Sequence, residues 1–214
     1  MLEQAEYALG PVDAARELIR ANGWALLVSG NGDAAPMVSH LPVLLDPDAD
    51  PDADDAAGQA TVLGHLPARD AEAHRLGERP VVLVAQGPHG YVSPSWYRAG
   101  PYVPTWNYTA VHLHGTPELL DAAGTYRVLE LTTEHFEGAR PTPWPLESVD
   151  AYARAIAPHA VGFRLRPTRV VAKGKLSQDK PPEVIERVIA ALRADPTHAN
   201  PPLAETMRER FPLR

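Results

Sequence analysis

Two β-patterned segments joined by a tight turn constrain the fold of this chain more than any other feature. Trp24–Ser29 is a short apolar run typical of a buried strand, and Met37–Leu45 follows as its return strand. Between them, Gly30–Asp33 reads Gly-Asn-Gly-Asp, which is a strong hairpin signal because these residues tolerate positive φ. Pro42 has no amide hydrogen to donate, so we expect it at a sheet edge or a bulge.

Further strand and helix patterns follow along the chain. Pro80–Gln86 is apolar on both faces, which predicts a central strand. The other expected strands are Thr61–His65, Asn107–Leu120 and Ala160–Lys173, the last with a break at Pro167. The expected helices are Val12–Ala21 (ending at Asn22-Gly23), Ala68–Leu76, Thr125–Glu137, Ser148–Ala157 and Pro182–Ala194. Short strands, hairpin turns and flanking helices favour an α+β, mostly β fold: a six-stranded antiparallel barrel with helices outside it.

Composition narrows the class of protein. The 214 residues suit one large domain or a domain with an appendage, and the absence of cysteine excludes disulfides and thiolate metal sites. A net charge of -7 argues against nucleic-acid binding, although basic residues gather between Arg164 and Lys180. We see no secretory signal and no apolar stretch near the ~20 residues of a membrane span, so we expect a cytoplasmic protein without membrane contact.

Asp46–Ala60 is rich in aspartate, proline and alanine and invites comparison with a calcium-binding loop. Such a loop requires glycine at its sixth position and glutamate at its twelfth. Counted from Asp46, these positions hold Pro51 and Ala57, and the register from Asp48 fails in the same way. We therefore expect a solvated acidic hairpin loop.

Gly87–Trp106 is expected to be a loop of unusual length and aromatic content. Its rings are Tyr91, Trp96, Tyr97, Tyr102 and Trp106. Exposing so many rings to water is unfavourable, so they must pack on something. Two interpretations stay open: a loop folded over its own core or over a partner subunit, and a wall for a planar ligand.

Polar residues elsewhere form weaker candidate sites. His112 and His114 point to one face of a strand, but two histidines without a third ligand are poor support for a metal, and we predict none. His65 and Arg69 lie at a strand end, where they fit either a phosphate site or ordinary surface positions. Lys173–Gln178 is likewise either an anion-binding turn or the solvated end of a strand.

Two central blocks, Gln86–Tyr97 (QGPHGYVSPSWY) and Val103–His112 (VPTWNYTAVH), are long and distinctive. They resemble the signature of the PaiB family, the FMN-binding negative transcriptional regulators. Shorter supporting pieces occur in family order between about Trp24 and Ala194: Ser39–Pro42, Gly64–His65 and Lys175–Gln178 before a helix. The chain departs from the family after His65. The family's Ala-Arg-Ala-Asn-Pro run is altered there, with Arg69 displaced by one position and an acidic Asp70 that would repel a phosphate.

The resemblance implies a single FMN-binding split-barrel domain over residues 1–214, of Greek-key type and similar to the pyridoxamine-phosphate oxidase superfamily. A helical C-terminal extension would begin at about residue 180. It also implies a homodimer with FMN at the subunit interface. The cofactor-binding residues implied are Ser39, His40, Leu41 and Pro42 beside the isoalloxazine, Gly64, His65 and Arg69 towards the phosphate, Trp106 and Asn107 on a second wall, and Lys175 and Gln178 as further candidates.

The function implied by the resemblance is that of a negative transcriptional regulator or flavin-dependent sensor. Direct DNA binding is possible but unsupported by the net charge. The alternative is an FMN-dependent oxidoreductase acting on an unknown small molecule, in which no catalytic residue is assigned and the candidate acids are His40, His89 and Tyr91. The least favoured reading is a haem-binding or haem-degrading relative with a histidine ligand from among His65, His112 and His114.

Overall fold

The computed structural model describes residues 1–49 and 60–211, which fall into two compact units. The first unit consists of Met1–Pro11, Gln86–Val111 and the described chain from Val171 onward. The second unit consists of the described residues of Val12–Ala85 and of His112–Val170. Two long strands, β4 (Val81–Val92) and β5 (Thr105–Gly115), pass from one unit into the other.

The second unit is built on an antiparallel sheet with the strand order β6-β7-β3-β2-β1-β4. Besides β4, its strands are β1 (Trp24–Asn31), β2 (Ala34–Leu45), β3 (Val62–Pro67), β6 (Glu118–Leu119) and β7 (Ala160–Leu165). β1 and β2 form the hairpin expected from the Gly-Asn-Gly-Asp turn, with Val28 paired to Val38. Alternate residues of the strands fill the core, among them Leu27, Leu41, Val43, Leu83 and Phe163.

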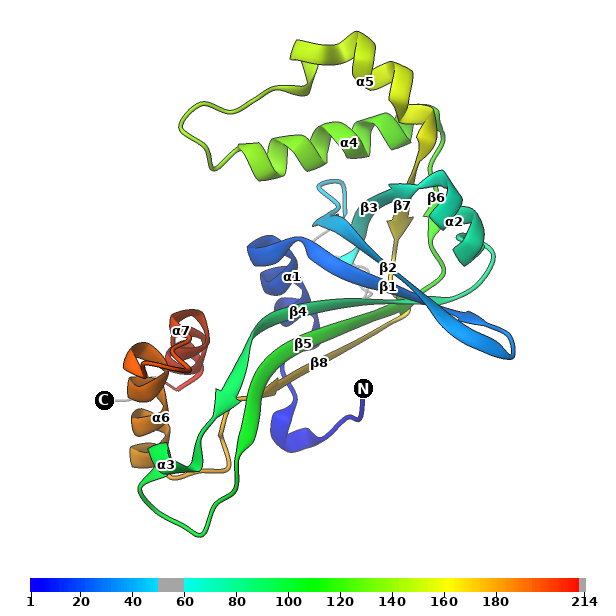
Figure 1. Cartoon of the computed structure of the whole chain (residues 1–214). Coiled ribbons are helices and arrows are strands. Elements are labelled where there is room, and N and C mark those ends of the chain that lie inside the picture. The colour runs from blue at the N-terminus through cyan, green and yellow to red at the C-terminus, as the bar shows by residue number, and fades with distance from the viewer. Residues whose placement is uncertain (50–59, 212–214) are drawn as a thin grey trace. The chain divides into compact units, whose positions relative to one another are not determined.

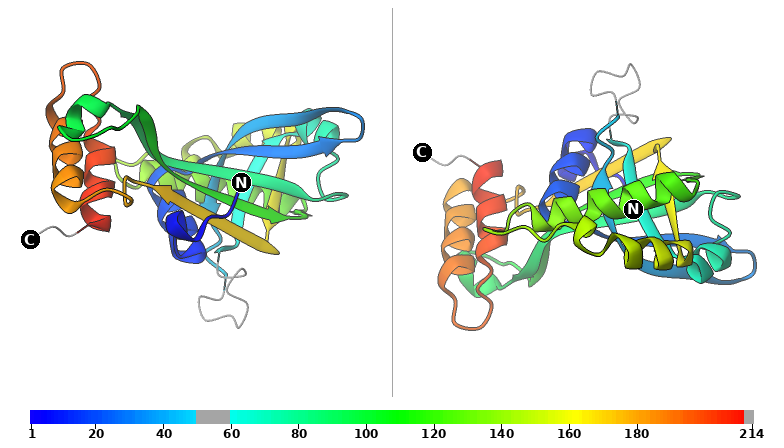
Figure 2. Two further views of the ribbon diagram at one scale, coloured as in Figure 1. Left: turned by 90° about the horizontal axis from the view of Figure 1, so that it is seen from below. Right: turned by 90° about the horizontal axis from the view of Figure 1, so that it is seen from above.

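Helices accompany this sheet (Figures 1 and 2). They are α1 (Pro11–Asn22), α2 (Ala68–His74), α4 (Ala122–Glu137) and α5 (Asp150–Ile156), with the short 3-10 turns η3 (Leu146–Val149) and η4 (Ala157–His159) around α5. α1 ends where the sequence predicts, because Gly23 takes φ +60 and allows a left-handed C-terminal cap. α4 begins at an N-cap, since the Asp121 carboxylate accepts a hydrogen bond from Gly124 N at 2.7 Å.

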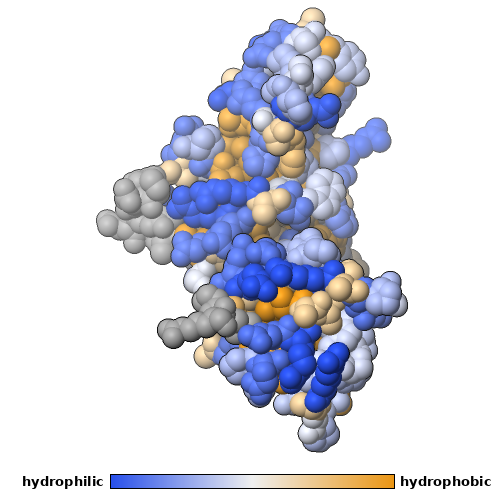
Figure 3. All heavy atoms as spheres, turned by 90° about the vertical axis from the view of Figure 1, so that its left-hand side faces the viewer, coloured by the Kyte–Doolittle hydropathy of each residue, from blue (hydrophilic) through white to orange (hydrophobic). Residues whose placement is uncertain are grey.

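The first unit combines parts of β4 and β5 with β8 (Arg169–Lys175), in that order in the sheet. Its helical elements are η1 (Ala5–Tyr7), α3 (Pro94–Tyr97), α6 (Pro182–Ala194) and α7 (Pro201–Arg210). The apolar face expected for α6 is buried against α3 and α7, in a cluster that includes Val188, Leu192, Leu203 and Met207. Hydrophilic side chains cover much of the outward surface of α6 and α7 (Figure 3). The helix expected at Pro182–Ala194 is present as α6, and α7 follows it.

Several expectations about local structure need correction. Eight strands are found in the described residues instead of six, because Pro167 separates β7 from β8 and the chain after Gly115 forms the short β6. Pro42 is at neither an edge nor a bulge, since β2 lies between β1 and β3. It is tolerated because it faces Trp24, the first residue of β1, and pairing with β3 begins only at Val43.

The long aromatic loop was also predicted wrongly. β4 continues to Val92 and β5 begins at Thr105, so the connection is Ser93–Pro104 and contains the single turn α3. Gly90 lies within this continuation and leaves room for Asn200, because a Cβ at residue 90 would stand 2.9 Å from Asn200 Nδ2.

The acidic segment is described only at its start. Asp46 is buried, and its carboxylate pairs with Arg164 Nε at 2.6 Å, so this aspartate is not part of a solvated loop. Residues 50–59 lie outside the described part of the chain. No helix in residues 1–49 and 60–211 has the length and apolar character needed to cross a membrane.

Candidate functional site

Ser39, the first of the residues predicted to bind flavin, belongs to a buried hydrogen-bonded chain in the second unit. Its hydroxyl donates to Asp70 Oδ2 at 3.1 Å. His74 Nε2 lies 3.0 Å from Ser39 Oγ, and His74 Nδ1 lies 2.8 Å from Ser29 Oγ. Since the single proton of Ser39 goes to the carboxylate, Nε2 must donate to Ser39 and Nδ1 must accept from Ser29. The chain of donors therefore runs in one direction, from Ser29 to Asp70.

This arrangement explains the acidic residue that departs from the family pattern. Asp70 lies on α2 and accepts a hydrogen bond from the neighbouring strand β2. Burial lowers the pKa of His74, and the nearby Asp70 opposes that shift only in part. His74 is fully buried and was not identified from the sequence, because its partners are 35 and 45 residues away along the chain.

The residues of β2 that follow Ser39 differ in their exposure to solvent. His40 is exposed and its ring stacks on Trp24, with ring centroids 6.3 Å apart and planes 26° apart. Trp24 is 51% exposed, although the sequence predicted a buried strand there. Leu41 is buried in the core and Pro42 is half-buried. Within Ser39–Pro42, the His40 ring is therefore exposed, whereas Leu41 faces inward.

β3 carries Gly64 and His65 beside β2, since Gly64 pairs with Val43 on one side and Phe163 on the other. A Cβ at position 64 would stand 2.6 Å from Phe163 Cζ, so this glycine makes room for a core ring. His65 is half-buried, its Nδ1 lacks a hydrogen-bond partner among the described residues, and burial lowers its pKa. Arg69 is exposed on α2. His65 and Arg69 thus lie on consecutive elements, β3 and α2, and their role at a phosphate stays a prediction.

Trp106 forms an aromatic platform in the first unit. Its indole is 50% exposed, and its Nε1 donates to His89 Nδ1 at 3.3 Å while the two rings stack with centroids 6.0 Å apart. Tyr91 meets the indole edge-on at 6.5 Å, and its ring also contacts His198 at 4.9 Å. Asn200 Nδ2 donates to the His89 carbonyl at 2.8 Å. The indole is therefore held in one orientation while half of it stays open to a ligand.

The two predicted amide residues are engaged within the protein. Asn107 is fully buried, and its Nδ2 donates to Ser177 Oγ at 2.9 Å and to Met207 Sδ at 3.5 Å. Gln178 Nε2 donates to the carbonyls of Gly174 and Glu6, while its Oε1 accepts from Leu176 N. Lys175 is half-buried, and its ammonium donates to the Thr105 hydroxyl. Asn107 and Gln178 thus stabilise the end of β8, and Lys175 keeps its charge at that end.

The histidines considered as metal or haem ligands lie on β5 and β3. His112 and His114 have ring centroids 6.2 Å apart, and burial lowers the pKa of both. His114 Nε2 is buried without a hydrogen-bond partner in the described part of the chain. Within that same part, no group of three or more histidine, aspartate or glutamate side chains is placed to hold a metal ion.

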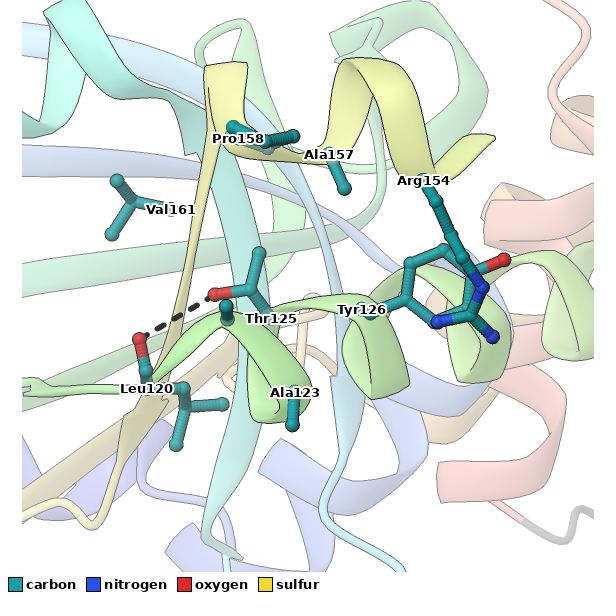
Figure 4. A pocket seen from close by; sticks show the side chains of 10 residues that line it. Leu120, Ala123, Thr125, Tyr126, Arg154, Ala157, Pro158 and Val161 are labelled. Carbon is teal, nitrogen blue, oxygen red and sulfur yellow. Dashed lines mark hydrogen bonds between the residues drawn. The ribbon is translucent and has the colours of Figure 1, made fainter. Parts of the chain in front are cut away.

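A cavity of about 460 Å³ in the second unit lies beside α4, α5 and β7 (Figure 4). Its polar side chains satisfy one another. Tyr126 donates to Asp150 Oδ1 at 2.8 Å, Arg154 Nε donates to Asp150 Oδ2 at 2.9 Å, and the Arg154 guanidinium lies 4.2 Å from the Tyr126 ring centre. Thr125 Oγ1 donates to the Leu120 carbonyl at 3.5 Å. None of the residues predicted to bind flavin lines this cavity.

The fold defines the class of protein. Its solved relatives include a FAD- and haem-binding protein of Mycobacterium smegmatis, with a TM-score of 0.54 and 14% identity over 81% of this chain and 76% of that one. They also include the flavocytochrome Anf3 of Azotobacter vinelandii, with a TM-score of 0.55 and 14% identity over 81% and 72%. The chain is a split β-barrel: a mostly antiparallel sheet with peripheral helices. At these identities, the likeness concerns the fold alone.

Sequence comparison then identifies the family. The family described as "Putative FMN-binding domain" matches residues 1–169, and this chain, a flavin-binding protein, belongs to it. The chain is 32% identical over 136 residues to the protease synthase and sporulation protein PAI 2 of Bacillus subtilis, which confirms the PaiB resemblance. That match covers 61% of this chain and 63% of the Bacillus protein, so the chain spans less than two thirds of this relative's length. An uncharacterised protein of Aspergillus fumigatus is 26% identical over 100% of this chain and 99% of its own length.

Proposed function

We propose that the flavin bound by this chain is FMN and that Trp106 forms one wall against its ring system. The observation that carries this proposal is the exposed indole, which His89 and Tyr91 already hold in a fixed orientation. When a planar ligand stacks on a ring that is already oriented, the ring's side chain loses little further entropy. Stacked aromatic pairs contribute about 0.5–1.5 kcal/mol beyond area burial. Bound FMN supplies the redox chemistry, and the protein supplies orientation and electrostatics.

We further propose that the chain acts as a homodimer with the flavin at the subunit interface. Trp24 and Trp106 support this, because each remains about half exposed within the single chain. Covering these two indoles with a partner subunit or a ligand would remove apolar surface from water, which favours association. His40, which stacks on Trp24, would then lie beside the isoalloxazine, and His65 and Arg69 would lie towards the phosphate.

Flavin uptake tests the FMN proposal directly. The purified chain is expected to be yellow or to acquire bound-flavin bands when FMN is added. Trp106→Ala should weaken FMN binding about tenfold, whereas Trp106→Phe should retain most of the affinity. Trp144→Ala is a matched control, because Trp144 is also exposed, at 46%, but lies outside the proposed site. A colourless chain that takes up no FMN would contradict the proposal.

The dimer is tested by sedimentation of the wild type and of Trp106→Ala, with and without FMN. We expect the wild type to sediment as a dimer and Trp106→Ala to dissociate at higher protein concentrations than the wild type does. A wild type that stays monomeric when saturated with FMN would exclude a subunit-interface site. Unchanged FMN retention and unchanged dimerisation in Trp106→Ala would show that this residue is misplaced.

For the cellular role, we propose a cytoplasmic regulator of the PaiB type that acts through flavin occupancy. The net charge of -7 favours regulation through a partner over direct contact with DNA. A gel-shift experiment at near-physiological salt tests this, because low salt exaggerates non-specific binding. A specific shift of upstream DNA by the chain alone would show that a partner is unnecessary.

An FMN-dependent oxidoreductase is the second candidate function. It is favoured by His89, whose imidazole ring stacks on Trp106, the proposed flavin wall. Adding NADH or NADPH to the flavin-loaded chain under nitrogen separates the two roles. Bleaching of the flavin bands favours a reductase, and their persistence favours a passive binder or sensor.

A further inference from the structure

A second cavity, of about 300 Å³, lies in the first unit next to the end of β8. Its walls include the rings of Tyr7, Tyr97 and Tyr102, and its charged lining residues are Lys175, Asp179 and Lys180. Two lysines and one aspartate are therefore among the residues that line this space. A cavity lined by tyrosines and by an excess of positive charge suits a small anionic ligand.

The hydroxyl of Tyr97 lacks a partner here. Tyr97 is 1% exposed, and its Oη is buried with no hydrogen-bond partner among the described residues. Leaving such a group unsatisfied costs about 1–3 kcal/mol, so a ligand that offers this hydroxyl an acceptor would gain affinity from it. Burial raises the pKa of Tyr97, which keeps the hydroxyl protonated and able to donate.

The two lysines are differently engaged. Lys180 Nζ lies 4.5 Å from the Tyr102 ring centre and 2.5 Å from Asp179 Oδ2, so its charge is partly offset. Lys175 donates to the neutral hydroxyl of Thr105, which leaves its positive charge undiminished by that contact. An ammonium group is a compact donor that suits phosphate oxygens.

We propose that this cavity binds the phosphate group of a small molecule, with the Tyr97 hydroxyl and the Lys175 ammonium as donors. Lys180 adds long-range attraction, and the tyrosine rings bound the space around the group. The proposal does not depend on flavin binding and is tested on flavin-free protein; if FMN is the source, its phosphate lies here and not towards His65 and Arg69. The phosphate can come from FMN or from a separate phosphorylated compound, and the experiment distinguishes the two.

The first measurement is a calorimetric titration of the flavin-free full chain with inorganic phosphate at constant ionic strength. The wild type should bind with a saturable isotherm, and Lys175→Gln and Tyr97→Phe should each weaken binding about tenfold. Arg193→Gln is the matched control, since it removes one positive charge from an exposed position of α6 outside the cavity. Equal phosphate affinity in all four proteins, or no saturable binding by the wild type, would overturn the proposal.

Thermal unfolding gives a second readout that does not depend on ligand affinity. Without phosphate, Tyr97→Phe should melt at or above the wild-type temperature, because it removes an unsatisfied buried hydroxyl and keeps the ring. With phosphate, the wild type and Arg193→Gln should gain stability and Tyr97→Phe should gain little. A clear loss of stability in phosphate-free Tyr97→Phe would show that the hydroxyl has a partner within the protein and would overturn its role as donor.

The source of the phosphate follows from repeating the titration on protein saturated with FMN or with riboflavin. If FMN itself supplies the group, FMN abolishes phosphate binding, riboflavin does not, and Lys175→Gln weakens FMN but not riboflavin. If another molecule supplies it, phosphate still binds to the FMN-loaded chain. Either result supports the cavity as a phosphate site, and failure of flavin uptake leaves the phosphate titration unaffected.

Discussion

Replacing Gly64 with alanine tests whether this position serves the cofactor or the core. A Cβ at residue 64 would stand 2.6 Å from Phe163 Cζ and 2.9 Å from Phe163 Cε1, and Phe163 is fully buried. The ring must therefore shift inside a packed interior. Overpacking of this kind costs about 1–3 kcal/mol. For a chain of this size, that lowers the melting temperature by roughly 2–12 °C.

The assay is thermal unfolding of Gly64→Ala beside Gly30→Ala, because a Cβ at Gly30 meets nothing within 4 Å. We expect Gly30→Ala to stay within about 0.5 kcal/mol of the wild type. Phe163→Leu should relieve the clash, so the double variant with Gly64→Ala should lose less than the sum of the single variants. Strict additivity, or a melting temperature for Gly64→Ala equal to that of the wild type, would refute the steric argument and return Gly64 to the flavin site.

Three further predictions concern buried polar groups. Burial lowers the pKa of His65, His74, His112 and His114, so the unfolded chain binds protons more readily, and stability should fall as the pH drops below about 6.5; urea unfolding at several pH values checks this. Ser39→Ala leaves the buried Nε2 of His74 without its acceptor and should cost about 1–3 kcal/mol, measured by urea unfolding. Asp46→Asn breaks the pair with Arg164 and should cost about 1–2 kcal/mol in the same assay, with a smaller loss at high salt.

Patterns among neighbouring residues predict most of the fold. The hairpin turn, the Gly23 stop and the one-sided apolar pattern of α6 each depend on neighbouring residues, and each was predicted correctly. The continuation of β4 was missed because its glycine and proline residues are usual in loops. The approach of Asn200 accounts for Gly90, and these two residues are far apart along the chain.

In the candidate site, too, features that depend on neighbouring residues were predicted and those that depend on distant residues were missed. An aromatic wall was anticipated at Trp106, but its partners His198 and Asn200 were not, since no local pattern links them to β4. His74 was missed for the same reason. Asn107 and Gln178 were chosen as ligand contacts from a family resemblance, whereas the structure shows their amides bonded within the protein. The direct flavin contacts stay a prediction.

The side chain of Asn200, at the start of α7, makes two hydrogen bonds with different roles. Asn200 Oδ1 accepts from Leu203 N and so begins the helix, while its Nδ2 holds the His89 carbonyl behind the aromatic platform. The family match ends at residue 169, before this brace begins. Members of the family can therefore share the residues of the platform and still differ in how firmly it is held. Variation at position 200 would then tune flavin affinity without altering His89, Tyr91 or Trp106 themselves.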